Sequence, residues 1–199
     1  GKTSLINLLM RFYDPTAGRV LYNGIDLKIM PPERVRRQMA LVAQDPFLFS
    51  GTIGDNIRFG QPSLPTDRMA RIVRAANCED LVAKLDGGLD YRLSEGGARL
   101  SSGERQLIAI ARALARDPQL IILDEATSYI DSQTEQQVQD ALKNLLAGRT
   151  ALIIAHRLST AREADRIVVL NRGRIIEIGS HDQLIQKQAF YYQLYRLQS

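Results

Sequence analysis

Two adjacent carboxylates, Asp124 and Glu125, directly follow the apolar run Leu120-Ile121-Ile122-Leu123. Four apolar residues are too few to cross a membrane and are typical of a strand buried on both faces of a parallel sheet. Because neighbouring strand residues point in opposite directions, the two carboxylates can serve two different partners. The carboxyl ends of such strands are also where open α/β sheets bind ligands. The plain alternative is an acidic turn that caps the next helix.

The first four residues, Gly1-Lys2-Thr3-Ser4, precede an apolar stretch with helical character. Gly-Lys-Thr at the start of a helix is the second half of the phosphate-binding loop G-x-x-x-x-G-K-[ST]. In that loop backbone N–H groups attract phosphate, the lysine reaches the β- and γ-phosphates, and the threonine hydroxyl holds Mg²⁺. The chain starts within the motif, which we interpret as a truncation. We therefore expect residues 1–199 alone to bind nucleotide poorly and to be inactive.

Two further polar residues stand at the ends of predicted strands. Gln44 follows the short apolar run 40–43, and His156 follows the run 150–155. A glutamine at a strand end can contact a metal or a water, although a lone one is more often a surface amide. A lone histidine there is usually a hydrogen-bonded structural residue.

Ser101 and Glu104 flank Gly103 just before an apolar helical stretch. Serine followed three residues later by glutamate predicts a capping box, and this is the structural explanation of the pair. A capping box does not require glycine between its members, however. The glycine leaves the helix N-terminus uncrowded, so its positive dipole end can also receive an anion.

The remaining pattern predicts the elements that must position these residues. Strands are expected at 18–24 with an Asn-Gly turn, 40–43, 120–123, 150–155, 166–170 and 174–178, and helices at 32–38, 66–76, 79–85, 107–114, 132–146 and from His181. This alternation predicts an α/β fold with a mostly parallel sheet. The apolar loop at Phe47 and Phe49 is interpreted as core packing, with an exposed aromatic pair for a partner's helix as the alternative. His181 is expected to be solvated.

Composition excludes several classes of protein. The net charge is +4 and the pI about 9.4, but acids and bases are interspersed and the densest basic cluster, Arg34 to Arg37, is short, so no nucleic-acid partner is expected. The one cysteine, Cys78, cannot form an internal disulfide, which fits a reducing compartment, and we expect it to pack. No apolar run approaches the roughly 18 residues of a membrane helix. We expect no complete membrane anchor within the chain.

These motifs, in this order, resemble the nucleotide-binding domain of ATP-binding-cassette (ABC) transporters over essentially the whole chain. The matches are Gly1–Ser4 with the end of Walker A, Gln44 with the Q-loop, Leu100 to Glu104 with the signature LSGGQ, Leu120 to Asp124 with Walker B, Glu125 with its catalytic carboxylate, Ser128 to Asp131 with the D-loop, and His156 with the switch histidine. The stretches 45–53, 154–160 and 179–184 look most like exporters whose membrane and ATPase parts share one polypeptide. Ser102 and Glu104 depart from the usual glycine and glutamine. Serine adds a small hydroxyl, so we expect a working but altered phosphate contact.

The resemblance implies a P-loop NTPase (RecA-like) fold, a mostly parallel sheet core with an inserted α-helical subdomain. The core would be residues 1–46 and 118–199, the subdomain 47–117, and a membrane domain would lie upstream. ATP and Mg²⁺ are the implied cofactors. The implied roles are catalysis by Glu125 and His156, nucleotide binding by Gly1, Lys2, Thr3, Ser4, Gln44, Ser101, Gly103 and Asp131, and metal binding by Thr3, Gln44 and Asp124.

The implied partners are a second ABC ATPase domain, identical or related, and the transporter's membrane domain. Two ATP molecules would lie between the head-to-tail ATPase domains, at the cytoplasmic face of the plasma or inner membrane. Phe47, Phe49 and Glu95 would transmit the cycle to the membrane domain. The nearest alternative is the ATPase of an ABC importer. A DNA-repair or chromosome-structure ATPase would carry a coiled coil or zinc modules before the signature, and a non-hydrolysing module commonly lacks the counterpart of Glu125 or His156.

Overall fold

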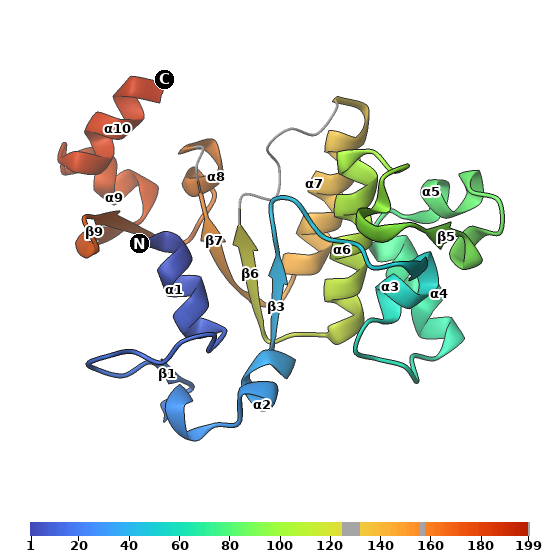
Figure 1. The fold of residues 1–199 in the computed structure, drawn as a ribbon. Coiled ribbons are helices and arrows are strands. Elements are labelled where there is room, and N and C mark those ends of the chain that lie inside the picture. Colours follow the sequence, from blue (N-terminus) through green and yellow to red (C-terminus); the bar gives the residue numbers. More distant parts are fainter. Residues whose placement is uncertain (125–131, 156–157, 199) are drawn as a thin grey trace. The chain divides into compact units, whose positions relative to one another are not determined.

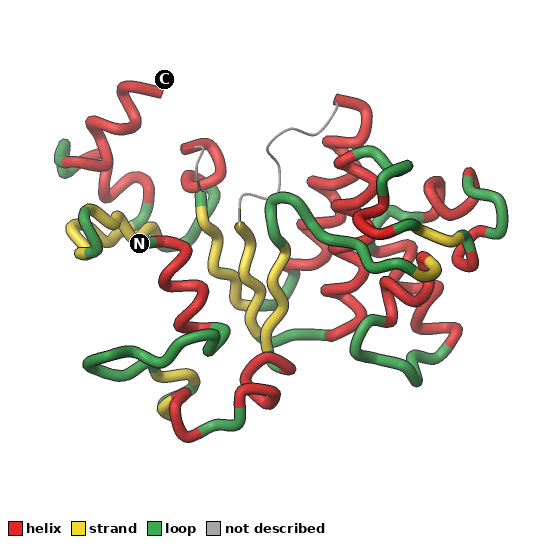
Figure 2. The backbone as a smooth tube through the Cα atoms, viewed as in Figure 1, coloured by secondary structure: helices red, strands yellow, loops and turns green. Residues whose placement is uncertain are grey.

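The structure, a computed structural model, describes residues 1–124, 132–155 and 158–198 (Figures 1 and 2). Its helices and strands are, in order, α1 Lys2–Leu9, β1 Leu21–Tyr22, β2 Ile25–Asp26, α2 Pro32–Arg37, β3 Met39–Val42, β4 Gly51–Thr52, α3 Ile53–Arg58, α4 Thr66–Ala75, α5 Glu79–Lys84, β5 Arg92–Leu93, α6 Ser102–Arg116, β6 Leu120–Asp124, α7 Ser132–Leu146, β7 Thr150–Ile154, α8 Leu158–Arg162, β8 Ile167–Asn171, β9 Arg174–Gly179, α9 His181–Gln186 and α10 Phe190–Gln198. Among these described helices, none is long and apolar enough to span a membrane.

The chain divides into two compact units. The first consists of Gly1–Pro31 and Ile153–Ser199, and the second of Pro32–Leu152. Each unit is described by itself below. The division predicted above, with a helical subdomain at 47–117, stays a prediction.

The centre of the second unit is β6. Ile121 and Ile122 are fully buried, and β6 pairs in parallel with β3, with Met39 opposite Leu120 and Val42 opposite Leu123. The sheet order is β3-β6-β7. The continuous apolar run therefore forms a parallel strand buried on both faces, as predicted, because helices cover such strands on each side.

Helix α6 is the main packing partner of this strand region. It contacts α7, α3, α4 and β3, and Figure 1 shows α7 running alongside it. Its apolar residues Leu107, Ile108 and Ile110 are buried. The helix ends at Asp117, which adopts a left-handed conformation with φ of 48°, and Pro118 follows. Proline directly after such a cap stops the helix and directs the chain into β6.

The segment from residue 47 to 59 differs from the predicted apolar loop. Gly51 and Thr52 form the strand β4, which pairs antiparallel with β5, and Thr52 caps α3 in a capping box with Asp55. Leu48 is fully buried beside Gly97, where an added Cβ would lie 2.9 Å from Leu48 Cδ1. The aromatic residues on either side of Leu48 are exposed instead. The core interpretation is therefore right for Leu48 and wrong for Phe47 and Phe49, which form the exposed aromatic pair of the alternative.

The first unit contains two antiparallel hairpins. In the β1–β2 hairpin, Asn23 and Gly24 both have positive φ, 50° and 78°, as the predicted Asn-Gly turn requires. The β8–β9 hairpin packs against α9 and α10 through Ile167, Val169, Leu184 and Tyr191.

His181, at the start of α9, is half-buried rather than solvated. Its Nδ1 lies 2.9 Å from the hydroxyl oxygen of Tyr191, a residue of α10. The prediction of a solvated side chain was wrong, because it placed His181 on a helix start without considering the helix that packs over it.

Cys78 packs as expected, with 1% of its surface exposed, and burial raises the pKa of its thiol to about 12. Only the thiolate reacts with iodoacetamide, so at about pH 8 we expect the native protein to be labelled more than about tenfold more slowly than the urea-unfolded chain. Cys78 is the only cysteine, so mass spectrometry of the labelled chain over time measures both rates. Equal rates would show that the region between α4 and α5 opens readily.

Candidate functional site

The first candidate group, Gly1 to Ser4, opens helix α1 in the first unit. Gly1 is the N-cap and makes no side-chain capping bond, and no acidic residue lies in the first turn. Thr3 and Ser4 are exposed. A helix N-terminus without a capping side chain or a nearby carboxylate presents its N–H groups and its positive dipole end to an anion. This arrangement suits a phosphate group.

Lys2 is half-buried, and its Nζ donates a hydrogen bond of 3.2 Å to the carbonyl oxygen of Ala155. Ala155 follows β7 directly and precedes His156 in the chain. The bond uses one of the three donors of the lysine ammonium. The structure thus brings the predicted phosphate-binding lysine to the end of the strand that leads to the predicted switch histidine.

The second candidate group lies at the carboxyl ends of β3 and β6 in the second unit. Asp124 is the last residue of β6 and is half-buried, whereas Gln44 is exposed two residues after the end of β3. Since Val42 lies opposite Leu123 in the parallel register, both polar side chains follow the same edge of the sheet. This is the edge where α/β sheets bind ligands.

Ser101 caps the N-terminus of α6. Its Oγ accepts a bond of 3.1 Å from the Glu104 N–H, and Glu104 Oε2 accepts one of 2.8 Å from the Ser101 N–H. The predicted capping box is therefore confirmed. Ser101 is exposed and Gly103 is buried in the first turn. A hydroxyl that accepts one bond can still donate its own hydrogen, so the cap is compatible with a phosphate contact.

Glu104 stands where the signature usually has glutamine, and its two carboxylate oxygens have different partners. While Oε2 completes the capping box, Oε1 accepts a bond of 3.2 Å from Lys84 Nζ on α5. A glutamate at this position thus joins the start of α6 to α5. Glutamine could complete the same capping box, so only this ion pair distinguishes the carboxylate, and the exposed lysine makes the pair worth little energetically.

Three predicted site residues, Glu125, Asp131 and His156, lie outside the described residues. The rest fall into the two units: Gly1 to Ser4 in the first, and Gln44, Ser101, Gly103 and Asp124 in the second. Within each unit the structure places the residues at a helix N-terminus or at a strand end. Their roles toward nucleotide and metal stay predictions.

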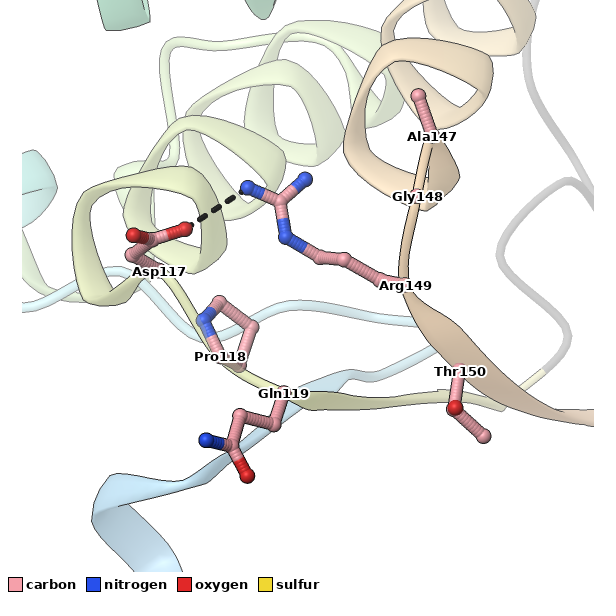
Figure 3. A pocket seen from close by; sticks show the side chains of 7 residues that line it. All are labelled: Asp117, Pro118, Gln119, Ala147, Gly148, Arg149 and Thr150. Carbon is pink, nitrogen blue, oxygen red and sulfur yellow. Dashed lines mark hydrogen bonds and ion pairs between the residues drawn. The ribbon is translucent and has the colours of Figure 1, made fainter.

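A shallow pocket in the second unit lies away from these residues. The residues that line it include Asp117, Gln119, Arg149 and Thr150, and they lie where β6 and β7 begin (Figure 3). This is the opposite end of β6 from Asp124. Arg149 Nη2 forms an ion pair of 2.9 Å with Asp117 Oδ1 across it. Its lining contains none of the predicted site residues, and the ion pair joins the end of α6 to the start of β7.

Sequence reasoning missed two residues near the exposed aromatics, Arg112 and Asn56. Arg112 lies within the apolar part of α6, and burial lowers the pKa of its guanidinium. Asn56 is one of two polar side chains that are buried among the described residues. The available signal was a charged residue inside the run Ala109-Ile110-Ala111-Arg112-Ala113, because an arginine is seldom buried without partners.

Comparison with known proteins gives consistent matches. A family profile described as "ABC transporter" matches residues 1–128. An ATP-dependent lipid A-core flippase of Syntrophus aciditrophicus is 47% identical over all of this chain and 33% of its own length, and a fatty acid ABC transporter ATP-binding/permease protein of Mycobacterium bovis is 46% identical over 98% of this chain and 31% of its own. A bacterial Atm1-family ABC exporter solved with ATP bound matches with a TM-score of 0.92 and 38% identity over all of this chain and 35% of that one.

The chain spans about a third of the length of the curated relatives it matches. The matched profile covers the helix with the Gly-Lys-Thr sequence, the capped start of α6 and the strand that ends at Asp124. The fold is that of a P-loop NTPase of the α/β class, as the solved exporter shows. From these motifs, this fold and these matches it follows that the chain belongs to the ABC transporter family, as part of its ATP-binding domain.

Proposed function

We propose that the chain is the ATP-hydrolysing domain of an ABC exporter, in which ATP binding, dimerisation and hydrolysis drive transport across a membrane. The observation that carries the proposal is that Asp124 and Gln44 lie at one edge of the sheet, where the parallel strands β6 and β3 end. The relatives support it, because their names describe exporters and ATP-binding/permease proteins.

Phosphoryl transfer to water depends mainly on positioning and on neutralising charge. Lys2 and the N-terminus of α1 would neutralise the phosphates, which fits the uncapped, carboxylate-free first turn. Glu125 would polarise the attacking water, and His156 would contact the γ-phosphate. These two roles rest on the family resemblance.

The oxygen donors available suit Mg²⁺. This ion prefers oxygen ligands, keeps several waters and usually binds one or two carboxylates together with substrate phosphates. Asp124 supplies a half-buried carboxylate, and within the described residues of its own unit it forms no ion pair. A half-buried carboxylate without a counter-charge favours a cation. Gln44 and Thr3 would add an amide and a hydroxyl oxygen, and the metal would offset the phosphate charge.

A second set of contacts to the nucleotide would come from another ATPase domain. Ser101 and Gly103 at the start of α6, with Asp131, would close over ATP bound to the opposite domain in a head-to-tail dimer. The N-terminus of α6 is exposed at Ser101, as such a contact requires. ATP would then join the two domains, and its hydrolysis would release them.

The membrane domain would contact an aromatic patch formed by Phe47, Phe49 and Phe59. Their exposed fractions are 51%, 40% and 45%. The rings of Phe47 and Phe49 meet edge to face at 5.3 Å, and those of Phe49 and Phe59 stack at 4.5 Å. A contiguous cluster of exposed aromatic rings marks an interaction surface. We assign it to a cytoplasmic helix of the membrane domain, and the chain would then lie at the cytoplasmic face of the membrane.

The test is phosphate release from MgATP by the full-length protein in lipid. Hydrolysis that needs Mg²⁺ and stops on addition of EDTA is expected, because Asp124 binds the nucleotide through the metal. A folded, membrane-embedded protein that binds MgATP without hydrolysing it would contradict the proposal. The full gene sequence distinguishes the exporter from the importer alternative. An exporter of the kind found among the relatives carries its membrane helices on the same polypeptide.

A further inference from the structure

Arg112 connects α6 to the segment that carries the aromatic patch. It lies eleven residues beyond Ser101, about 16 Å along the helix at 1.5 Å per residue. Its guanidinium donates from Nη1 to the carbonyl oxygen of Phe47 at 3.0 Å, from Nε to the carbonyl oxygen of Asn56 at 3.0 Å, and from Nη2 to Asn56 Oδ1 at 2.8 Å. One side chain thus holds both the 47–52 segment and α3.

Asn56 completes this connection from α3. With 2% of its surface exposed, its Nδ2 donates to the carbonyl oxygens of Phe49 at 2.9 Å and Thr52 at 3.0 Å. Its Oδ1 accepts from the Phe49 N–H at 2.9 Å as well as from Arg112. An amide has two donor hydrogens and two acceptor lone pairs, and all four are used here. A buried polar network that is fully satisfied is rigid, because any shift leaves a buried group without its partner.

Arg112 also contacts two aromatic rings of the patch. Its guanidinium carbon lies 5.4 Å from the ring centre of Phe49 and 5.6 Å from that of Phe59. A cation at this distance over an aromatic face is attracted by the ring quadrupole. The backbone of the patch and two of its rings therefore take their position from one residue of α6.

We infer that Arg112 and Asn56 are positioning residues that fix the aromatic patch to α6, so that a displacement of the Ser101 end of the helix is delivered to the patch. The inference rests on the proposed function, which supplies a nucleotide at one end and a membrane domain at the other. Neither residue lies near Ser101. Their loss should therefore leave nucleotide binding intact and uncouple the patch from it.

Arg116 provides a matched control on the same helix. One turn after Arg112, its Nη2 donates to the carbonyl oxygen of Arg36 at 2.7 Å, next to the end of α2 and away from the patch. Burial lowers the pKa of its guanidinium, as it does for Arg112. Arg116→Gln removes a comparable part-buried charge and a bond to a backbone carbonyl without touching Phe47, Phe49 or Asn56.

The first measurement is hydrogen exchange of the Phe49 amide in the full-length protein. This amide bonds to Asn56 Oδ1, which Arg112 holds in place. In Arg112→Gln we expect its exchange to be about tenfold faster, and in Arg116→Gln to stay within about twofold of wild type. Arg112→Lys keeps the charge but not the planar fork, so an intermediate rate is expected. If Arg112→Gln does not fold, Arg112→Lys carries the test.

The second measurement is MgATP hydrolysis by the same proteins in lipid. In Arg112→Gln we expect KM to stay within about twofold and kcat to fall about tenfold. The reason is that closure of the two ATPase domains would no longer move the aromatic patch together with α6. Arg116→Gln should leave kcat within about twofold of wild type. Equal effects of the two variants on Phe49 exchange or on kcat, or a rise in KM that parallels the loss of kcat, would overturn the inference. If the wild-type protein hydrolyses no ATP, the proposed function is contradicted instead. Hydrogen exchange of the Phe49 amide then still tests the role of Arg112.

Discussion

Glu125→Gln in the full-length transporter is expected to lower ATP turnover by about 10²–10⁴-fold, the usual contribution of a positioned base, while ATP affinity stays nearly unchanged. Glutamine keeps the shape and much of the hydrogen bonding of glutamate but removes the charge that we propose polarises the attacking water. Because that charge acts mainly in the transition state, its loss lowers kcat rather than binding. Nucleotide should then persist between the two domains and trap the closed dimer.

Asp124→Asn is the matched comparison, since it makes the same change one residue earlier. Asp124 is the last residue of β6. Because neighbouring residues of a strand point in opposite directions, we expect the two carboxylates to have separate partners. Removing the charge of Asp124 should weaken MgATP binding itself, because this carboxylate is the proposed metal ligand. Turnover, equilibrium MgATP binding and the fraction of dimer are measured for both variants. Near-normal hydrolysis by Glu125→Gln, or an equal loss of binding in both, would contradict the assignment.

The parts of the fold that sequence could predict are those fixed by local pattern. The run Leu120 to Leu123 forms the buried parallel strand, because a short apolar run that ends in polar residues suits a strand covered on both faces. Asn23 and Gly24 form the predicted hairpin turn, because both positions need positive φ. Ser101 and Glu104 form the predicted capping box from their spacing alone. Each of these signals lies within a few residues of the structure it specifies.

The parts that sequence could not predict depend on contacts between distant segments. Phe47 and Phe49 look like core residues from their type, and only the pairing of β4 with β5 and the burial of Leu48 show that they face outward. Arg112 and Asn56 are separated by 56 residues, so neither residue indicates the other. His181 becomes half-buried because α10 packs over it.

Ser101→Asp in the full-length transporter is expected to lower ATP turnover by about 10²-fold or more, comparable to the loss of a transition-state donor, while isolated monomers bind ATP normally. Aspartate is as good an N-cap as serine, so the bond from the Glu104 N–H is kept and α6 stays intact. The new carboxylate, however, would face the γ-phosphate held by the opposite domain, and the two negative charges would repel each other. ATP-driven dimerisation, measured by light scattering beside turnover, should fail.

Two further variants separate this repulsion from the loss of a cap. Ser101→Ala removes the capping bond at a cost of about 0.5–2 kcal/mol in stability, without adding charge, so its turnover should exceed that of Ser101→Asp. Ser180→Asp changes the serine of an equivalent capping box at the start of α9 and should leave turnover unchanged. If Ser101→Asp weakened ATP binding to the monomer as much as it weakened dimerisation, Ser101 would be a local cap and not a contact with the partner's nucleotide. Because aspartate keeps the cap, a loss of dimerisation without a loss of ATP binding to the monomer supports a contact of residue 101 across the interface.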